Sequence, residues 1–384
     1  MACAALLAGA GPSAAAPKPP DSLPATNWLL VDESTGDVLA ERGADAPRPI
    51  ASATKLMTAF IALRELSPAD EVTAPQYEAV PAESLMGLDA GEVVSVRDLL
   101  YGLLLASGND AAAALAIRVS GSVPDFVAEM NRAARRLGLA ETRYTDPIGL
   151  DGGNVSSARD LASLATRLRA DPLFRRIVDT PRITVGSPPE RHRLVNRNTL
   201  VLEEPFVNGV KTGTTIAAGY VLVGSGKRRG VELLSAVLGA LSEAARDEAT
   251  LALLDYGFSL YRERALVTAG ERIATLDLGE RGRLPLVADA ALESVARRDQ
   301  DIEVDYPEPA PPDGAVARGQ RFGTAIVSLD GERVGGVAVV AGRTVAAPRD
   351  TGLPEWAWIV FGAAGGVALA LATAAVVVAL RPPR

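Results

Sequence analysis

Three short motifs carry side chains that together could perform acyl transfer: Ser52-Ala-Thr-Lys55, Ser107-Gly-Asn109 and Lys211-Thr-Gly213. Residues three apart on a helix lie on one face, so Lys55 can reach the hydroxyl of Ser52. A partly desolvated lysine near other cations has a lowered pKa and can accept the serine proton. If Ser52 opens its helix, its backbone N–H and the positive helix end favour a developing oxyanion. The first motif therefore predicts a serine nucleophile with a lysine base.

The other two motifs supply polar groups that could complete such a site. Ser107-Gly-Asn109 stands where a leucine-rich stretch meets an alanine-rich one, and a junction of two helices can project side chains into a cleft. Lys211 offers a second ammonium for a substrate carboxylate, and Gly213 lets a substrate backbone approach closely. Each motif alone is a weak signal, but their order favours a functional set, as does the presence in them of two of the chain's four lysines.

Rare residues exclude several other chemistries. Cys3 and His192 are the only cysteine and histidine, so the chain cannot build a His/Cys zinc site, a Cys–His pair or a disulfide. We expect no metal and no cofactor. A Ser-His-Asp triad would need His192 as its base, and this residue follows a proline-rich loop, which predicts a position at the surface or the substrate's edge. Asp146 and Asp151 predict a turn with capping acids, and Glu92 predicts a charge at a helix start.

The overall composition indicates a folded chain and argues against one class of partner. The hydrophobic content of 48 % supports packed cores, and the net charge of −8 argues against nucleic acid as a partner.

The elements that must position the motifs follow from periodicity. Apolar spacing predicts a helix starting near Ser52 and others over 122–137, 161–168 and 242–260. Strands are predicted over 28–31, 38–41, 219–225 and 231–238. This order predicts an α/β (α+β) domain over 24–262. Its sheet takes its first strands from the N-terminal side and its last from the C-terminal side, with a helical insertion between them.

A composition change near residue 262 predicts a second domain. Short strands alternate with turns such as Leu329-Asp-Gly-Glu332 and predict a small all-β domain over 263–346, followed by a linker over 347–354. The predicted strands cover 271–278, 284–287, 301–306, 324–329 and 333–340.

The last part of the chain predicts a membrane anchor. Residues 356–380 contain no charge, and about 37 Å of helix would cross a bilayer. Trp356 and Trp358 suit the interface, and Arg381 and Arg384 lie just beyond. We therefore expect a single-pass transmembrane helix over 355–380, a cytoplasmic tail over 381–384 and an extracytoplasmic catalytic domain. Residues 1–23 predict an export segment with a small-residue cleavage site, although no cation precedes it.

The motifs and their flanks give the chain a resemblance to a known family. The stretches 48–58, 99–110, 157–161 and 208–214 read like the low-molecular-mass penicillin-binding proteins of the D-alanyl-D-alanine carboxypeptidase family, peptidase family S11. The likeness covers roughly residues 24–262, and the β-domain is similar to that family's C-terminal domain. It implies a β-lactamase/transpeptidase-like catalytic domain with an antiparallel sheet and a helical subdomain.

The resemblance also implies a role for each motif residue. It implies that Ser52 is acylated, that Lys55 is its general base, and that Ser107 relays a proton to the leaving D-alanine. Asn109 would orient Lys55 and the substrate amide. The terminal carboxylate would be bound around Gly213 by Lys211, Thr212 and Thr214, and the backbone N–H groups of Ser52 and Thr214 would form the oxyanion hole. The substrates implied are peptidoglycan stem peptides, with β-lactams as covalent inhibitors.

Other functions stay open at this point. A D,D-endopeptidase would use the same motifs. A class A β-lactamase is less favoured, because no Glu-x-x-x-Asn lies between Gly138 and Ala170. A non-catalytic anchored sensor of wall peptide or β-lactam is disfavoured by the intact Ser52, Lys55 and Lys211.

Overall fold

The computed structural model describes residues 17–20, 22–81, 83–186 and 190–348. Two compact units divide the chain, Met1–Arg264 with Val295–Gln300 and Ala265–Ser294 with Asp301–Arg384. The predicted export segment lies mostly outside the described residues, and the predicted transmembrane helix lies wholly outside them. Within the described residues no single helix is both long and apolar enough to cross a membrane. Among these residues one pair of consecutive helices, Asn109–Ser120 and Val123–Arg136, is together long and apolar enough to cross a membrane, but the pair is bent by 83°.

The first unit is organised around a five-stranded antiparallel sheet of order β2-β1-β11-β10-β9. The strands are β1 (Asn27–Asp32), β2 (Val38–Arg42), β9 (Val207–Thr215), β10 (Gly219–Arg228) and β11 (Val231–Ala240). The prediction that early and late strands share one sheet is confirmed. Strand β9, which carries the third motif, was not predicted, and it forms one edge of the sheet.

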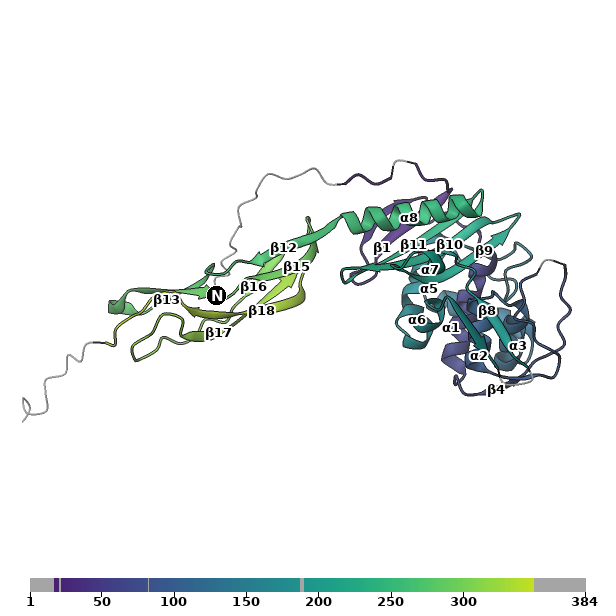
Figure 1. Cartoon of the computed structure of the whole chain (residues 1–384), viewed down its shortest axis with the longest axis horizontal. Helices are drawn as coiled ribbons and strands as arrows, with labels where there is room; N and C mark the ends of the chain where they lie inside the picture. Colours follow the sequence, from purple (N-terminus) through teal and green to yellow (C-terminus); the bar gives the residue numbers. More distant parts are fainter. Residues whose placement is uncertain (1–16, 21, 82, 187–189, 349–384) are drawn as a thin grey trace, which may run out of the picture. The chain divides into compact units, whose positions relative to one another are not determined.

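Alternating side chains of β1 build a hydrophobic core on each face of this sheet. Leu29 and Val31 belong to one core, which packs against the helical part of the unit. Trp28 and Leu30 belong to the other, which packs against α8 (Glu243–Ser259). This alternation follows from the two-residue repeat of a strand. Figure 1 shows α8 on one side of the sheet and α5 and α1 on the other.

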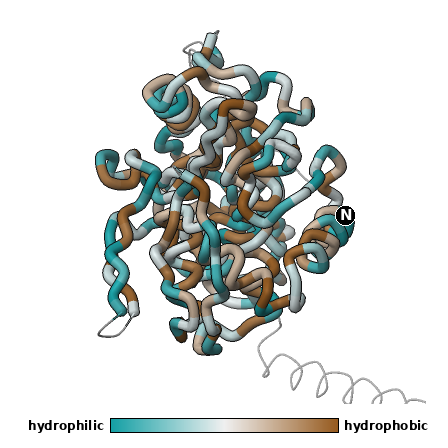
Figure 2. Tube along the Cα trace, turned by 90° about the vertical axis from the view of Figure 1, so that its right-hand side faces the viewer, coloured by the Kyte–Doolittle hydropathy of each residue, from teal (hydrophilic) through white to brown (hydrophobic). Residues whose placement is uncertain are grey.

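Helices inserted between β2 and β9 carry the first two motifs. They are α1 (Lys55–Glu65), α2 (Val96–Leu104), α3 (Asn109–Ser120), α4 (Val123–Arg136), α5 (Ala158–Arg169), α6 (Pro172–Val178) and α7 (Leu200–Glu203). Serine caps at Ser95, Ser122, Ser157 and Ser242 each accept a backbone N–H of the first turn, which explains where four of the helices begin. In Figure 2, hydrophobic and hydrophilic stretches alternate along the chain, and several of the outer turns are hydrophilic.

Short two-stranded sheets brace the loops between these helices. They pair β3 (Arg48–Pro49) with β6 (Val155–Ser156), β4 (Glu71–Thr73) with β5 (Val93–Ser95), and β7 (Arg182–Val185) with β8 (His192–Val195).

The second unit is all-β, as predicted. Its sheet has the order β13-β14-β18-β17-β16, with β13 (Arg272–Asp277), β14 (Arg283–Ala288), β16 (Ile302–Asp305), β17 (Arg321–Leu329) and β18 (Glu332–Ala341). Leu329 pairs with Glu332 across the predicted turn, where Asp330 and Gly331 both have positive φ, as a two-residue hairpin requires. Strands β12 (Tyr261–Val267) and β15 (Leu292–Arg297), which were not predicted, pair with each other.

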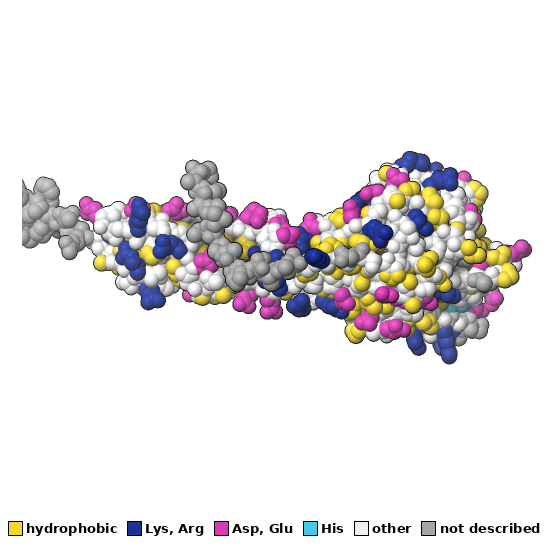
Figure 3. Space-filling view, turned by 90° about the horizontal axis from the view of Figure 1, so that it is seen from above, with side chains coloured by type: hydrophobic (Ala, Val, Ile, Leu, Met, Phe, Trp, Pro, Cys, Tyr) yellow, Lys and Arg dark blue, Asp and Glu magenta, His cyan; other side chains and the backbone are white. Residues whose placement is uncertain are grey.

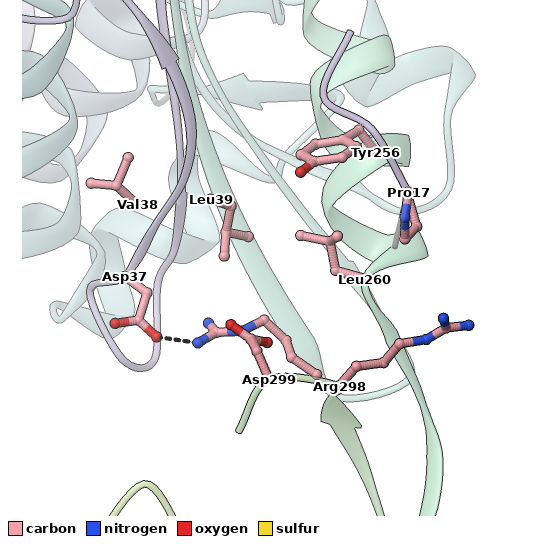
Figure 4. Close-up of a pocket in the computed structure, with 9 residues that line it drawn as sticks. Pro17, Asp37, Val38, Leu39, Tyr256, Leu260, Arg298 and Asp299 are labelled. Atoms are coloured by element: carbon pink, nitrogen blue, oxygen red, sulfur yellow. Dashed lines mark hydrogen bonds and ion pairs between the residues drawn. The ribbon is translucent and has the colours of Figure 1, made fainter. Parts of the chain in front are cut away.

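A hollow of about 500 Å³ lies in the first unit among residues outside the three motifs. Figure 4 shows Leu39, Tyr256 and Leu260 on its wall. The Arg297 guanidinium beside it lies 2.6 Å from Asp37 and 3.2 Å from Asp299, so this cation ties the β1–β2 turn to the end of β15. On the face drawn in Figure 3, acidic, basic and hydrophobic side chains are interspersed.

Candidate active site

Ser52 stands at the entrance to α1. It lies in a short 3₁₀ turn, Ala51–Thr54, and the α-helix proper begins at Lys55, so the helix starts slightly later than predicted. Ala51 has a φ of 48°, an uncommon value for a residue with a side chain, and such strain is often found at functional sites. Lys55 Nζ lies 3.0 Å from Ser52 Oγ, and Ser52 itself is half-buried. The hydroxyl therefore faces an amine while remaining reachable from outside.

Lys55 is fully buried and surrounded by acceptors. Its Nζ donates to Asn109 Oδ1 at 2.7 Å and to the carbonyl oxygen of Ile148 at 2.8 Å. Burial lowers the pKa of Lys55 from 10.5 to about 7, although the carboxylates of Asp146, Glu83 and Asp110 act to raise it. A lysine with this pKa is partly neutral at physiological pH and can act as a general base.

A tight turn presents the Ile148 carbonyl to this lysine. The Asp146 carboxylate accepts from the backbone N–H groups of Ile148 and Gly149, at 2.7 and 2.5 Å. Gly149 has a φ of 86°, and a Cβ there would lie 1.9 Å from the carbonyl oxygen of Ala51. The turn predicted around Asp146 is therefore confirmed, and it contributes directly to the surroundings of Lys55.

The second motif lies at the junction of α2 and α3, as predicted. Asn109 is the first residue of α3, and Ser107, two residues before it, has a φ of 60°. Both side chains are buried. Asn109 meets Lys55 from one side, and its Nδ2 donates to Glu83 Oε2 at 2.8 Å on the other. Glu83 was not among the residues singled out from the sequence.

Lys211 meets the second motif from β9. Its Nζ donates to Ser107 Oγ at 3.1 Å and to its neighbour's carbonyl oxygen, that of Thr212, at 2.9 Å. Burial and then the positive charges of Lys55, Arg197 and Arg246 hold the pKa of Lys211 well below its usual value. The two arginines were not predicted as parts of the site; their sequence neighbourhoods contain no motif.

Strand β9 also brings the third motif against the nucleophile. A Cβ on Gly213 would lie 2.7 Å from the carbonyl oxygen of Ile50 and 3.0 Å from the backbone nitrogen of Ser52. Only glycine lets the strand pass so close to Ser52. Thr212 is buried and Thr214 is exposed, and β9 is an edge strand. An extended peptide could therefore lie along this strand beside Ser52.

Two sequence interpretations are wrong: the surface position predicted for His192 and the helix start predicted for Glu92. His192 is buried, not on the surface, and its Nε2 lies 2.7 Å from Glu92 Oε1. Glu92 lies in the loop before β5 and not at a helix start. This pair joins β8 to the loop between β4 and β5, a contact between residues 100 positions apart, which no local pattern indicates.

The described residues contain no group of three or more His, Cys, Asp or Glu side chains that could hold a metal ion. The groups that the structure brings together are a hydroxyl beside a buried amine, a second hydroxyl beside a second amine, and an adjacent strand edge.

Comparisons with known proteins show the family and the fold to which the chain is similar. Residues 13–242 match the family described as D-alanyl-D-alanine carboxypeptidase, peptidase S11. The chain is 30 % identical to D-alanyl-D-alanine carboxypeptidase DacF of Bacillus subtilis over 338 residues, covering 85 % of each chain. Its fold is similar to the crystal structure of the D-alanyl-D-alanine carboxypeptidase DacD from Francisella tularensis, with a TM-score of 0.62 at 26 % identity, covering 88 % of this chain and 98 % of that one. It is also similar to penicillin binding protein 5 from Haemophilus influenzae, with a TM-score of 0.59 at 29 % identity, covering 85 % and 99 %.

Proposed function

Because this chain belongs to the D-alanyl-D-alanine carboxypeptidase family of serine peptidases, peptidase family S11, we propose that it removes the terminal D-alanine of peptidoglycan pentapeptides through an acyl-enzyme on Ser52. The observation that carries the proposal is the 3.0 Å contact between Ser52 Oγ and a buried Lys55 amine. The pKa of that amine, about 7, lets it take up a proton.

The first step is attack by Ser52. The neutral amine of Lys55 takes the hydroxyl proton while Oγ attacks the carbonyl carbon between the two D-alanines. The developing oxyanion is stabilised by backbone N–H groups, for which we propose those of Ser52 and Thr214. The passage of β9 close to Ser52 at Gly213 supports this pairing.

The second step is departure of the terminal D-alanine. Its amine needs a proton, which is the one that Lys55 took from Ser52. Ser107 relays it by donating its own hydroxyl proton to the leaving amine and accepting a proton in return, while Lys211 Nζ, 3.1 Å from Ser107 Oγ, holds this hydroxyl in place. Thr214 is exposed and suits contact with the terminal carboxylate, together with Thr212. Lys211 is buried and its Nζ donates to Ser107 Oγ, so we assign its amine, together with this hydroxyl, to the carboxylate end of the substrate. Water then hydrolyses the ester on Ser52.

The same acylation accounts for a β-lactam as an inhibitor, because its ring carbonyl presents Ser52 with an acyl group whose leaving nitrogen stays tethered. D,D-endopeptidase action on cross-links would use the same groups, and the position of β9 at the edge of the sheet, where an extended peptide can add, supports it as a second activity.

We further propose that the chain acts outside the cytoplasmic membrane as a single-pass protein, with residues 381–384 on the cytoplasmic side. The uncharged run over 356–380 supports a spanning helix. A peptidoglycan substrate supports an extracytoplasmic active site.

The activity is tested with the full-length protein in detergent. It should be labelled by a fluorescent penicillin and should release D-alanine from a diacyl-Lys-D-Ala-D-Ala peptide. Ser52→Ala should lose both, because among the described residues Ser52 supplies the hydroxyl that is hydrogen-bonded to Lys55. Normal labelling of the Ser52→Ala variant would refute the nucleophile. Labelling without D-alanine release would favour a sensor, and rapid penicillin hydrolysis would favour a β-lactamase.

A further inference from the structure

Glu83 belongs to none of the three motifs, yet its carboxylate is hydrogen-bonded to Asn109, which is itself hydrogen-bonded to Lys55. It comes from the loop between β4 and β5. Its Oε2 accepts from Asn109 Nδ2 at 2.8 Å and from the Tyr77 hydroxyl at 2.6 Å, and its Oε1 accepts from the backbone N–H of Val80 at 3.1 Å. An ionised carboxylate can only accept hydrogen bonds. The carboxylate is therefore held by three donors, one of which is the amide of Asn109.

These contacts allow one orientation of the Asn109 amide. An asparagine amide has an oxygen that accepts and a nitrogen that donates. With Nδ2 on Glu83, Oδ1 faces Lys55 Nζ at 2.7 Å. A flipped amide would turn its oxygen toward the Glu83 carboxylate and its N–H₂ toward the amine of Lys55. The first contact is repulsive, so Glu83 opposes the flip whatever the charge of Lys55.

We propose that Glu83 is a positioning residue for the acylation step: it holds the Asn109 amide so that Lys55 keeps its lone pair for Ser52. The proposal rests on the proposed function and names a further residue of that same site.

The reason lies in how a neutral amine is shared. Neutral Lys55 has two N–H groups and one lone pair, and it has three neighbours. The carbonyl of Ile148 and Oδ1 of Asn109 accept the two N–H groups, which leaves the lone pair for the Ser52 hydroxyl. If the Asn109 amide turned, its N–H₂ would donate to that lone pair and compete with Ser52. Glu83 thus acts on the base through Asn109, without touching Ser52.

The loop that carries Glu83 has a second attachment. The carboxylate of Asp110 accepts from the backbone N–H groups of Met86, Gly87 and Leu88 at 2.8 to 3.0 Å. The backbone N–H of Asn109 also donates to the Ser84 carbonyl at 2.8 Å. Replacing Glu83 therefore removes the contact with the Asn109 amide while these other bonds keep the loop in place.

Glu83 also acts on Lys55 by its charge. Burial opposes ionisation of Glu83, but hydrogen bonds from Tyr77, Asn109 and Val80 outweigh it and lower the pKa of this carboxyl. The charged groups around Lys55 are the carboxylates of Glu83, Asp146 and Asp110 and the cations Arg197 and Lys211. Removing the Glu83 charge lowers the pKa of Lys55 further, so the acid limb of the acylation profile should move to lower pH.

The test measures the second-order rate constant of labelling by a fluorescent penicillin, from about pH 5 to pH 9, on the full-length protein. Glu83→Ala should lower this constant by about 10- to 100-fold, because the side-chain amide of Asn109 is no longer held in the orientation that leaves the Lys55 lone pair free for Ser52. Glu83→Gln keeps an oxygen for Asn109 Nδ2, so it should lose much less than Glu83→Ala while its acid limb moves to lower pH. Glu78→Gln is the matched control, an exposed carboxylate in the same loop, and should leave both quantities unchanged.

Two results would contradict the role proposed for Glu83. Wild-type labelling by Glu83→Ala, or an acid limb of Glu83→Gln at the wild-type pH, overturns the proposal. If Glu83→Ala does not unfold cooperatively, the pH profile of Glu83→Gln decides alone. Failure of the wild-type protein to label or to release D-alanine would instead refute the proposed function.

Discussion

At the scale of single residues, the properties of Lys55 follow from its burial and from its hydrogen bonds. A fully buried ammonium is costly, and the protein reduces that cost by lowering the pKa of Lys55 to about 7. Two acceptors direct its N–H groups away from Ser52, so the nucleophile is activated without a histidine. The buried Glu92–His192 pair meanwhile braces a loop, which leaves the single histidine of the chain without a contact to Ser52.

The lowered pKa predicts a pH dependence. Below about pH 7 Lys55 is an ammonium without a lone pair, so labelling by penicillin should fall about tenfold for each unit of pH below that value. Above it the neutral amine predominates and the rate should level off. The measurement is stopped-flow or quenched labelling across the pH range. Lys55→Arg, whose guanidinium keeps its proton, should be inactive throughout. A rate that is flat from about pH 5 to pH 8 would contradict the role of Lys55.

At the scale of elements, a buried ion pair fastens α5 to the sheet. The Nε of Arg169, at the end of α5, lies 2.7 and 2.8 Å from the two carboxylate oxygens of Glu33, which follows β1. The side chains are only 1 % and 6 % exposed. Arg175, which is 45 % exposed, lies 3.8 Å from the same carboxylate. Helix α5 is thus joined to the sheet by charge as well as by apolar packing.

Removing one partner of this pair should destabilise the first unit. Arg169→Met leaves the buried Glu33 carboxylate with the more distant Arg175 as its remaining ion-pair partner in the described part of the chain, and a loss of about 3 kcal/mol in the free energy of unfolding is expected. Denaturant unfolding measures it. Adding Glu33→Gln to Arg169→Met should recover part of the loss.

The control is an exposed arginine. Arg159 pairs with Glu41 and Asp45 but is 38 % exposed, so Arg159→Met should cost no more than about 1 kcal/mol. Equal losses from the two arginine variants would show that the burial of the Arg169 pair has no special energetic effect.

At the scale of the whole molecule, two units with separate cores share one chain, and a spanning helix is proposed after the second. The five-stranded sheet of each unit is antiparallel, and all residues to which a catalytic or binding role is assigned belong to the first unit. The uncharged run that we propose as an anchor follows the second unit in the sequence. On this proposal, attachment and catalysis use different parts of the chain, and truncation should separate them.

The full-length protein, expressed in bacteria, should stay in the membrane pellet after an alkaline carbonate wash, because about 25 apolar residues in the bilayer resist extraction. A chain that ends at residue 348 should appear in the supernatant and keep its penicillin labelling. Immunoblotting and fluorescent penicillin measure the two properties. Retention of the shortened chain in the pellet would place the membrane attachment elsewhere.

Local spacing was enough to indicate the motif residues and most of the elements. Ser52 and Lys55 are three residues apart, so helical geometry alone brings them together. The period of apolar residues predicted α4, α5 and α8 and the strands β1, β2, β10 and β11. Strand β9 was missed because its glycines and threonines, at 209 and 212–215, do not alternate between apolar and polar.

Long-range packing decided the rest. Glu83 meets Asn109, the Ile148 carbonyl meets Lys55, and Glu92 meets His192 across 26, 93 and 100 residues of sequence. Such contacts depend on which loops fold over the α2–α3 junction, and short-range propensities carry no information about that. The sequence by itself therefore places Ser52 and Lys55 together, because they lie on one helical turn. The groups that orient Lys55 and lower its pKa come from distant loops and helices, so they meet only when the sheet and the helices pack.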